Sequence, residues 1–254
     1  RLRKGYGGKR RIYDYFPDLN LVFTGSSMIE LSQASGDLSR RAAMYKLHGL
    51  SLREYINLSE QQDFQTYRLE DIIQDDFQLD LGTLKPIALF QQYLQYGYYP
   101  FFKESSPAVY LEKLKETINV TLERDIPAVE EISLASVLKL RKFMGILSSS
   151  VPFKPNISKL SELLESTRES VVKYLYLLEK AGILSLLNTS TQGIRALGKP
   201  EKILFDNPNI MHALATATNV GTQRETFFAN QLSKAGHTLT LDKRGDFKVD
   251  EHYV

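Results

Sequence analysis

The chain has 254 residues, 43% hydrophobic and 24% charged, which is ordinary for a globular protein and enough for one large domain or two to three small ones. Its formal net charge of +2 is nearly neutral, so the total charge gives no reason to expect a nucleic acid or an anionic membrane as partner. The lack of cysteine excludes a disulfide framework and argues against a zinc site, and no apolar run reaches the ~18–20 residues that cross a bilayer, so we expect a cytoplasmic protein that does not enter a membrane.

An apolar run that ends in small polar residues gives the first predicted strand. The stretch LNLVFTGSSMIEL places Thr24 and Ser26 directly after apolar residues. A buried parallel strand delivers polar side chains to a site at its carboxyl end in this way. We therefore predict a strand over residues 19–24, followed by a helix over residues 28–41.

A short strand over residues 44–48 and a helix from Ser51 complete an α/β unit in residues 1–58. In that helix, Ser51 and Glu54 form a capping box. The basic start of the chain, RLRKGYGGKRR, is rich in glycine but does not match the phosphate-binding pattern G-x-x-x-x-G-K-[ST]. We expect this start to be solvated.

Residues 59–155 are predicted to form a helical connector. The stretch KPIALFQQYLQYG has Pro86 where a first helical turn accepts it and Gly97 where a helix ends. The aromatic stretch QYGYYPFF is predicted to be a core-packing turn between helices. Two longer helices follow, each with an apolar stripe at helical spacing: Tyr110/Leu111, Leu114, Ile118 and Leu122 in one, and Ile132, Val137, Leu140, Phe143, Met144 and Leu147 in the other.

Residues 156–205 carry the clearest pattern in the chain, that of a winged helix. The stretch NISKLSELLESTRESVVKYLYLLEKAGIL predicts two helices, over residues 157–165 and 167–181. Ser166 and Glu169 form a second capping box, and Gly182 ends the second helix. The strands ILSLL and EKILF then form a two-stranded wing.

The winged helix could serve either of two roles. Glu165, Glu169 and Glu179 lie on or beside the second helix, and a recognition helix normally presents more basic and amide groups than this one does. A protein-packing role therefore stays open beside DNA binding. If the module binds DNA, the residues that would contact it are Arg168, Lys173, Arg195 and Lys199.

These motifs together resemble a group of prokaryotic AAA-type ATPases. The stretches LVFTGSSMIEL and LSRRAAMYKLHGLSLREYINL are similar to the later half of that group's nucleotide-binding domain, which shows a strand ending in T-G-S-S, a helix, a G-R pair, a short strand and P-L-S-F-x-E-F. The group carries a C-terminal domain of unknown function, made of helices, a winged helix and a restriction-endonuclease-like fold. YLQYGYYPFF, YLEKLKETINVTLERDI, EKILFDNPNIMHAL and GTQRETFFANQLSKAG fit that pattern in order, so the resemblance runs from about residue 19 to the end.

The resemblance implies an ATP-binding protein that couples nucleotide binding or hydrolysis to its C-terminal module. Thr24, and with it Ser26, would lie at the sensor-like position near the γ-phosphate or the attacking water, and Arg41 would stabilise transition-state charge. The chain departs from the family pattern at Arg40, where the family has glycine, and at Gly49, where it usually has proline. The P-loop and the acidic metal-binding strand do not occur in these residues. ATP and Mg²⁺ are therefore expected as cofactors only if those motifs lie outside them.

The resemblance also raises the question of a nuclease site in residues 206–254, which read as helix, helix, strand, turn and strand. Endonuclease-like folds bind one or two metal ions with an acidic helix residue, a strand aspartate and an E-x-K motif. Glu225 and Asp246 fit the first two places, and no E-x-K follows within the chain. In a purely structural module, Glu225 would cap or pair and Asp246 would lie in a hairpin turn.

The expected fold class is therefore α/β plus mainly α. The expected function is that of an ATP-binding AAA-type ATPase of unknown cellular role. The alternatives are a non-catalytic DNA-binding winged-helix regulator and a metal-dependent nuclease, with a protein partner and an oligomeric state left open. The expected parts are the end of an AAA-type domain (1–58), a helical connector (59–155), a winged helix (156–205) and the start of a restriction-endonuclease-like domain (206–254).

Overall fold

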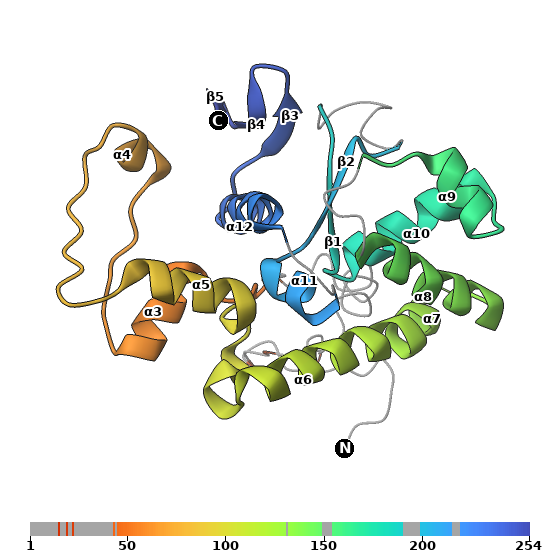
Figure 1. Ribbon diagram of the computed structural model, residues 1–254, viewed down its shortest axis with the longest axis horizontal. Helices are drawn as coiled ribbons and strands as arrows, with labels where there is room; N and C mark the ends of the chain where they lie inside the picture. Colours follow the sequence, from red (N-terminus) through yellow and green to blue (C-terminus); the bar gives the residue numbers. More distant parts are fainter. Residues whose placement is uncertain are drawn as a thin grey trace.

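The computed structural model describes most of the chain after residue 44. The described residues are 45–254 except 131, 149–153, 190–198 and 215–218, together with residues 15, 19, 22 and 43. The predicted site residues Thr24, Ser26, Arg41 and Arg195 lie outside them. Within the described part the fold is mixed α/β and mostly helical, with two small antiparallel sheets (Figure 1).

The predicted strands before Ser51 are not found where residues are described. Of the strand over 19–24, only Leu19 and Val22 are described; neither is in a strand, and Val22 is 93% exposed. Residues 45–48 likewise have no strand pairing, with Tyr45 and Leu47 both exposed. A strand in this position needs a neighbour to pair with, and the described residues provide none.

The helix predicted from Ser51 is confirmed, together with its capping box. The Ser51 Oγ accepts a hydrogen bond from the Glu54 amide at 3.2 Å, and the Glu54 carboxylate accepts one from the Ser51 amide at 2.8 Å. Pro86 begins and Gly97 ends the next long helix, as predicted. The first part of the fold consists of α3 (Leu52–Glu60), α4 (Leu69–Ile73), α5 (Pro86–Tyr96) and the 3₁₀ turn η1 (Pro100–Glu104).

A long helical segment follows and contains one widened turn. In α6 (Pro107–Val120) the predicted stripe of Tyr110, Leu114 and Ile118 is buried. The chain then passes through a π-helical turn, η2 (Thr121–Asp125), into α7 (Ile126–Val129). Pro127 has no amide to donate into the preceding turn, and this accounts for the interruption of regular helix there. After it comes α8 (Leu134–Ser148).

The predicted helix-turn-helix is present as α9 (Ile157–Leu163) and α10 (Arg168–Lys180). Gly182 lies in the left-handed region at φ 72°, and the amide of Ile183 donates to the Leu178 carbonyl, so α10 ends in a Schellman motif as predicted. The two strands that follow, β1 (Leu184–Leu187) and β2 (Lys202–Phe205), pair antiparallel from Leu184↔Phe205 to Leu187↔Lys202.

The predicted capping box at Ser166 is wrong by one residue. The cap of α10 is Thr167, whose hydroxyl accepts from the Ser170 amide at 3.1 Å. The amide of Ser166 already donates to the Ser161 carbonyl at 2.9 Å to close α9. This amide therefore does not donate to the Glu169 carboxylate, as a capping box at Ser166 would require.

The last part of the chain contains the predicted helix, helix, strand, turn and strand, and it ends in a third strand that was not predicted. In the sheet, β3 pairs with β4 through a bulge between Thr240 and Asp242, and β4 pairs with β5 at Lys248↔Tyr253. None of the helices in the described part is both long and apolar enough to cross a bilayer. The elements are α11 (Pro208–Leu214), α12 (Val220–Lys234), β3 (Leu239–Asp242), β4 (Gly245–Val249) and β5 (His252–Tyr253).

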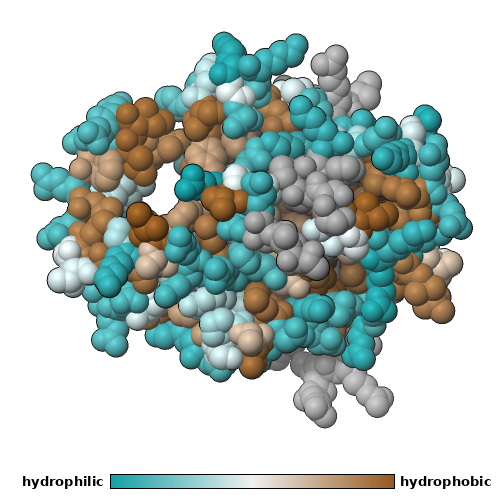
Figure 2. All heavy atoms as spheres, viewed as in Figure 1, coloured by the Kyte–Doolittle hydropathy of each residue, from teal (hydrophilic) through white to brown (hydrophobic). Residues whose placement is uncertain are grey.

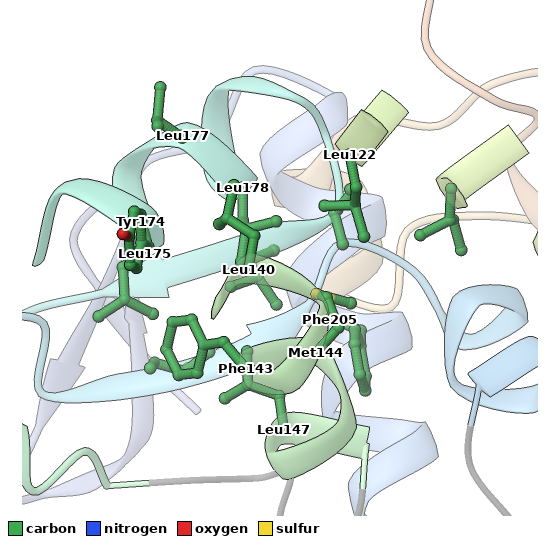
Figure 3. Packing of buried hydrophobic residues seen from close by; sticks show 14 of the residues in the cluster. Leu122, Leu140, Phe143, Met144, Leu147, Tyr174, Leu175, Leu177, Leu178 and Phe205 are labelled. Atoms are coloured by element: carbon green, nitrogen blue, oxygen red, sulfur yellow. The ribbon is translucent and has the colours of Figure 1, made fainter. Parts of the chain in front are cut away.

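The helix-turn-helix shares its core with the helical connector. The largest hydrophobic cluster combines buried residues of α6, α8, α9, α10, β1, β2 and α11. Figure 3 shows Leu140 and Met144 of α8 close to Leu178 of α10 and Phe205 of β2. Each such side chain contributes about 1.5–3 kcal/mol on burial, so the two regions stabilise one another. Two smaller clusters lie around Tyr55 and Tyr93, and between α12 and β4.

Candidate functional site

A pocket of about 220 Å³ lies where six parts of the chain meet. Residues 46–49 approach it from one side, and the end of α10 with Gly182 from another. The aromatic turn after α5 contributes Tyr98 and Tyr99. The remaining lining comes from the α6–η2 segment and from the polar pair at the base: Thr117, Thr121, Asp125, Asp206 and Lys234.

The base of the pocket is an ion pair between β2 and α12. Lys234 Nζ lies 2.6 Å from Asp206 Oδ1, and the Asp206 side chain is only 9% exposed. The Asn207 amide group donates to the Tyr99 hydroxyl at 3.1 Å, and the Asp206 amide donates to the Ile183 carbonyl at 2.9 Å. The Asp206 carboxylate also accepts a hydrogen bond from the Asn207 amide group at 3.4 Å. A buried carboxylate is tolerated when it is paired and hydrogen-bonded in this way.

The charged groups around this pair influence one another. Burial lowers the pKa of Lys46, and the nearby charge of Lys234 lowers it further. The pKa of His48 is lowered by the same two causes in the same order. Burial also raises the pKa of Glu179, which accepts a hydrogen bond from the Leu186 amide at 3.1 Å. The charged and polar side chains of the pocket can therefore form ion pairs and hydrogen bonds with a bound molecule.

A buried asparagine holds the aromatic turn against the C-terminal part of the chain. Asn209 Oδ1 accepts from the Tyr98 amide at 2.8 Å and from the Tyr110 hydroxyl. Its amide group donates to the carbonyls of Tyr93 at 2.8 Å and Leu94 at 2.9 Å. Because every polar atom of this fully buried side chain is paired, α11 is fixed to both α5 and α6.

The segment that leads into α3 is fastened to the same elements. The Leu50 amide donates to the Tyr98 carbonyl at 2.7 Å, and the Leu50 carbonyl accepts from the Tyr93 hydroxyl at 2.7 Å. Gln231 of α12 accepts from the Leu52 amide at 3.0 Å. At Gly49 a Cβ atom would lie 2.3 Å from the Tyr98 ring, so only glycine fits this approach.

Three of the predicted DNA contacts, Arg168, Lys173 and Lys199, lie in the described part of the chain. Arg168 begins α10 and is exposed, while Lys173 pairs with Glu130 at 3.1 Å. Lys199 is exposed beyond β1. Most of α10 is buried or half-buried, and its exposed residues carry both signs of charge: Arg168, Glu169, Lys173 and Lys180.

The two predicted metal ligands are described but do not come together. Glu225 of α12 forms an ion pair with Lys202 of β2, and both side chains are 16% exposed. Asp246 is exposed on β4, whereas its neighbour Phe247 is buried toward α12. Since alternate strand residues point to opposite faces, Asp246 faces away from Glu225. The pair does not fit a shared divalent ion, and the part of the chain that is described contains no group of three or more His, Cys, Asp or Glu residues able to hold one.

The residues that shape the pocket were not predicted from the sequence. The stretch KILFDNPNI does carry a signal, because three polar residues, Asp206, Asn207 and Asn209, follow directly on a buried strand. That is the pattern that pointed to Thr24 at the other end of the chain. The partners of Asn207 and Asn209 lie about a hundred residues away in sequence, and no local pattern identifies them.

Comparison with known proteins finds a family model that covers part of the pocket lining. A family model described as a domain of unknown function (DUF8612) matches residues 87–221, more than half of the chain. No curated protein and no solved structure matches the chain. The matched range runs from α5 to the start of α12 and so contains the helix-turn-helix and Asp206.

Proposed function

We propose that this chain, which belongs to the family described as a domain of unknown function (DUF8612), couples nucleotide binding or hydrolysis to a winged-helix and nuclease-like module, as an AAA-type ATPase would. The observation that carries this proposal is the double hydrogen bond of Leu50 to Tyr98 and Tyr93. Leu50 lies within the ATPase-like stretch LSRRAAMYKLHGLSLREYINL, which is thereby fastened to the part of the chain that holds the helix-turn-helix.

The contacts around Leu50 form a continuous path for coupling. Gly49 lies against the Tyr98 ring, and the Tyr98 amide is held by Asn209. Asn230 of α12 donates to the Tyr98 hydroxyl at 3.3 Å and to the Asp206 carbonyl at 2.8 Å. A displacement of residues 46–50 would therefore act on α11 and α12 together, because close-packed groups transmit strain rather than absorb it.

The residues assigned to the nucleotide are those that the resemblance marks. Thr24 and Ser26 would bind at the terminal phosphate, and Arg41 would offset the negative charge that develops during transfer. ATP with Mg²⁺ would supply the free energy for the motion. Such a motion requires contacts that differ between the nucleotide-bound and nucleotide-free states. We assign this difference to the close contact between Gly49 and the Tyr98 ring.

Titration of the full-length protein with Mg-ATP tests this function. We expect a measurable heat of binding by isothermal calorimetry, and a change in amide hydrogen exchange along α12 on addition of ATP. Arg41→Ala should remove or strongly weaken both effects. Gly49→Ala should preserve the heat and remove the exchange response of α12, because its new methyl group displaces Tyr98.

A matched glycine variant controls for the substitution itself. Gly145→Ala adds a methyl group with nothing within 4 Å, so both effects should persist. Tyr93→Phe deletes the hydroxyl that donates to the Leu50 carbonyl and accepts from Gln231 of α12, and it should also uncouple α12. No heat at high ATP concentration would overturn the nucleotide assignment, and an unchanged exchange response in Gly49→Ala would overturn the coupling path.

The DNA-binding and nuclease alternatives have less support from the described residues. At the exposed start of α10, Arg168 lies beside the acidic Glu169. The next exposed basic residue of this helix, Lys173, is already paired with Glu130. Glu225 is likewise bound to Lys202. Duplex binding that weakens steeply with salt would restore the DNA-binding alternative.

A further inference from the structure

A long arm of the chain contains no buried residue. Residues 61–85 leave α3, pass through the short helix α4 and return to α5 (Figure 1). Every residue in this range is exposed or half-buried. Connections longer than about 12–15 residues in a compact domain are uncommon, and when ordered they usually carry a function.

The arm has a definite shape that its own contacts maintain. At its base, Asn57 accepts from the Phe64 amide at 2.9 Å and donates to the Phe64 carbonyl at 3.1 Å. Across the arm, the rings of Tyr67 and Phe77 lie 5.5 Å apart, and the Tyr67 hydroxyl donates to the Gln78 carbonyl. The surface of the arm is therefore organised before any partner arrives.

Large apolar side chains are exposed along this arm. Ile72 and Ile73 at the end of α4 are 50% and 49% exposed, and Leu79 is 49% exposed. Figure 2 shows hydrophobic side chains on the protruding part of the molecule that carries α4. Gathered apolar side chains on an ordered protrusion mark an interaction site rather than ordinary surface. The set comprises Tyr67, Ile72, Ile73, Phe77 and Leu79.

The charges of the arm define the kind of partner. It carries six acidic residues against two basic ones, a formal charge of −4, whereas the whole chain carries +2. A second arm presented face to face would bring the same negative charge and be repelled. The acidic residues are Asp63, Glu70, Asp71, Asp75, Asp76 and Asp80.

We propose that residues 61–85 are a docking arm for a cationic amphipathic segment of a partner protein. The partner's apolar side chains would cover Ile72, Ile73 and Phe77, and its lysines or arginines would pair with the surrounding carboxylates. The family match begins at residue 87, directly after the arm, so the arm lies outside the region shared with the family. The docking arm does not depend on the nucleotide function proposed above.

Binding of a model peptide tests the proposal directly. The probe is a fluorescein-labelled Lys/Leu amphipathic peptide of about 14 residues, about four helical turns. Its affinity for the wild-type protein is measured by fluorescence anisotropy at several salt concentrations. Two further peptides keep the pattern but replace lysine by glutamate or leucine by serine. We expect the Lys/Leu peptide to bind at least about tenfold more tightly than either.

Variants of the protein separate the arm from the rest of the surface. Ile72→Ser/Ile73→Ser/Leu79→Ser should weaken Lys/Leu binding at least about tenfold without lowering the melting temperature, because no buried side chain is removed. Asp75→Lys/Asp76→Lys should weaken binding and flatten its salt dependence. The matched control, Leu134→Ser/Leu138→Ser, removes two exposed leucines of α8 and should bind as the wild type does.

Three outcomes would overturn the docking arm. They are equal binding of the Glu/Leu peptide, undiminished binding by the triple serine variant, and equal loss in the α8 control. Sedimentation velocity tests whether a second copy of the chain binds the arm instead. If the wild type forms a dimer that the triple serine variant lacks, the arm binds a second copy and the proposal of a cationic partner is wrong.

Discussion

Asn209 offers a test of how much the buried polar network contributes to stability. Replacing it by alanine removes the hydrogen bonds that Asn209 makes with the Tyr98 amide and the Leu94 carbonyl. The Tyr110 hydroxyl and the Tyr93 carbonyl lose Asn209 as well but keep the amides of Tyr99 and Gly97. Since each buried unpaired group costs about 1–3 kcal/mol, we expect Asn209→Ala to lower the free energy of unfolding by about 3 kcal/mol or more. Urea denaturation followed by circular dichroism measures the change.

An exposed asparagine provides the comparison. Asn219 caps α12 through hydrogen bonds to the amides of Gly221 and Thr222. Its replacement by alanine should cost about 1 kcal/mol, the usual value for a lost helix cap. Equal losses at Asn209 and Asn219 would show that the network around Asn209 adds nothing beyond a local hydrogen bond.

These polar residues also mark where prediction from sequence ended. Helix ends marked by glycine or proline were predicted from the sequence, because the backbone preferences of these residues act within a few positions. Pro86, Gly97 and Gly182 are examples. Asn209 binds Tyr98 and Tyr110 across about a hundred residues, and nothing local indicates that pairing. The pocket was therefore not predictable in the way that the helices around it were.

At the scale of elements, the start of α10 shows which of two neighbouring residues caps a helix. The stretch STRES allows either Ser166 or Thr167 to cap the helix, and Thr167 is the cap. We expect Thr167→Ala to lower stability by about 1 kcal/mol and Ser166→Ala to leave it nearly unchanged. Thermal unfolding of the two variants side by side decides between them, and the reverse order would restore the capping box at Ser166.

Neighbouring elements also explain why the strand predicted over residues 44–48 is not found at residues 45–48. The alternation in MYKLH is typical of a strand, yet Tyr45 and Leu47 are both more than 90% exposed. By contrast, ILSLL and EKILF do form strands, because each has the other as its partner. Alternation predicts only the conformation that a partner would stabilise, and the partner is a property of the fold.

At the scale of the molecule, buried tyrosines make stability depend on alkaline pH. Burial raises the pKa of Tyr55 and of Tyr98 from 10.0 to about 12. It raises the pKa values of Tyr93, Tyr99 and Tyr110 as well. These phenols stay protonated in the folded state while the unfolded chain ionises. Their contribution is therefore complete below pH 10 and is lost as the pH rises from 10 through 12.

The ultraviolet absorbance of tyrosinate measures this effect. Exposed tyrosines should ionise first and reversibly, and a second group should ionise only together with unfolding, monitored by circular dichroism. Tyr98→Phe removes one ionisable group and should shift the alkaline transition to higher pH, provided the fold is kept. A single titration near pH 10 without loss of structure would contradict the burial of these phenols.

The arm over residues 61–85 has one further consequence, for the continuity of the chain. Its cleavage would remove no core side chain, because none of its residues is buried. The residues on its two sides remain joined through Tyr55, whose ring lies 5.6 Å from that of Tyr93 and 4.9 Å from that of Phe102. We therefore expect a foreign domain inserted at the tip of the arm to leave the contacts of Tyr55 with Tyr93 and Phe102 intact.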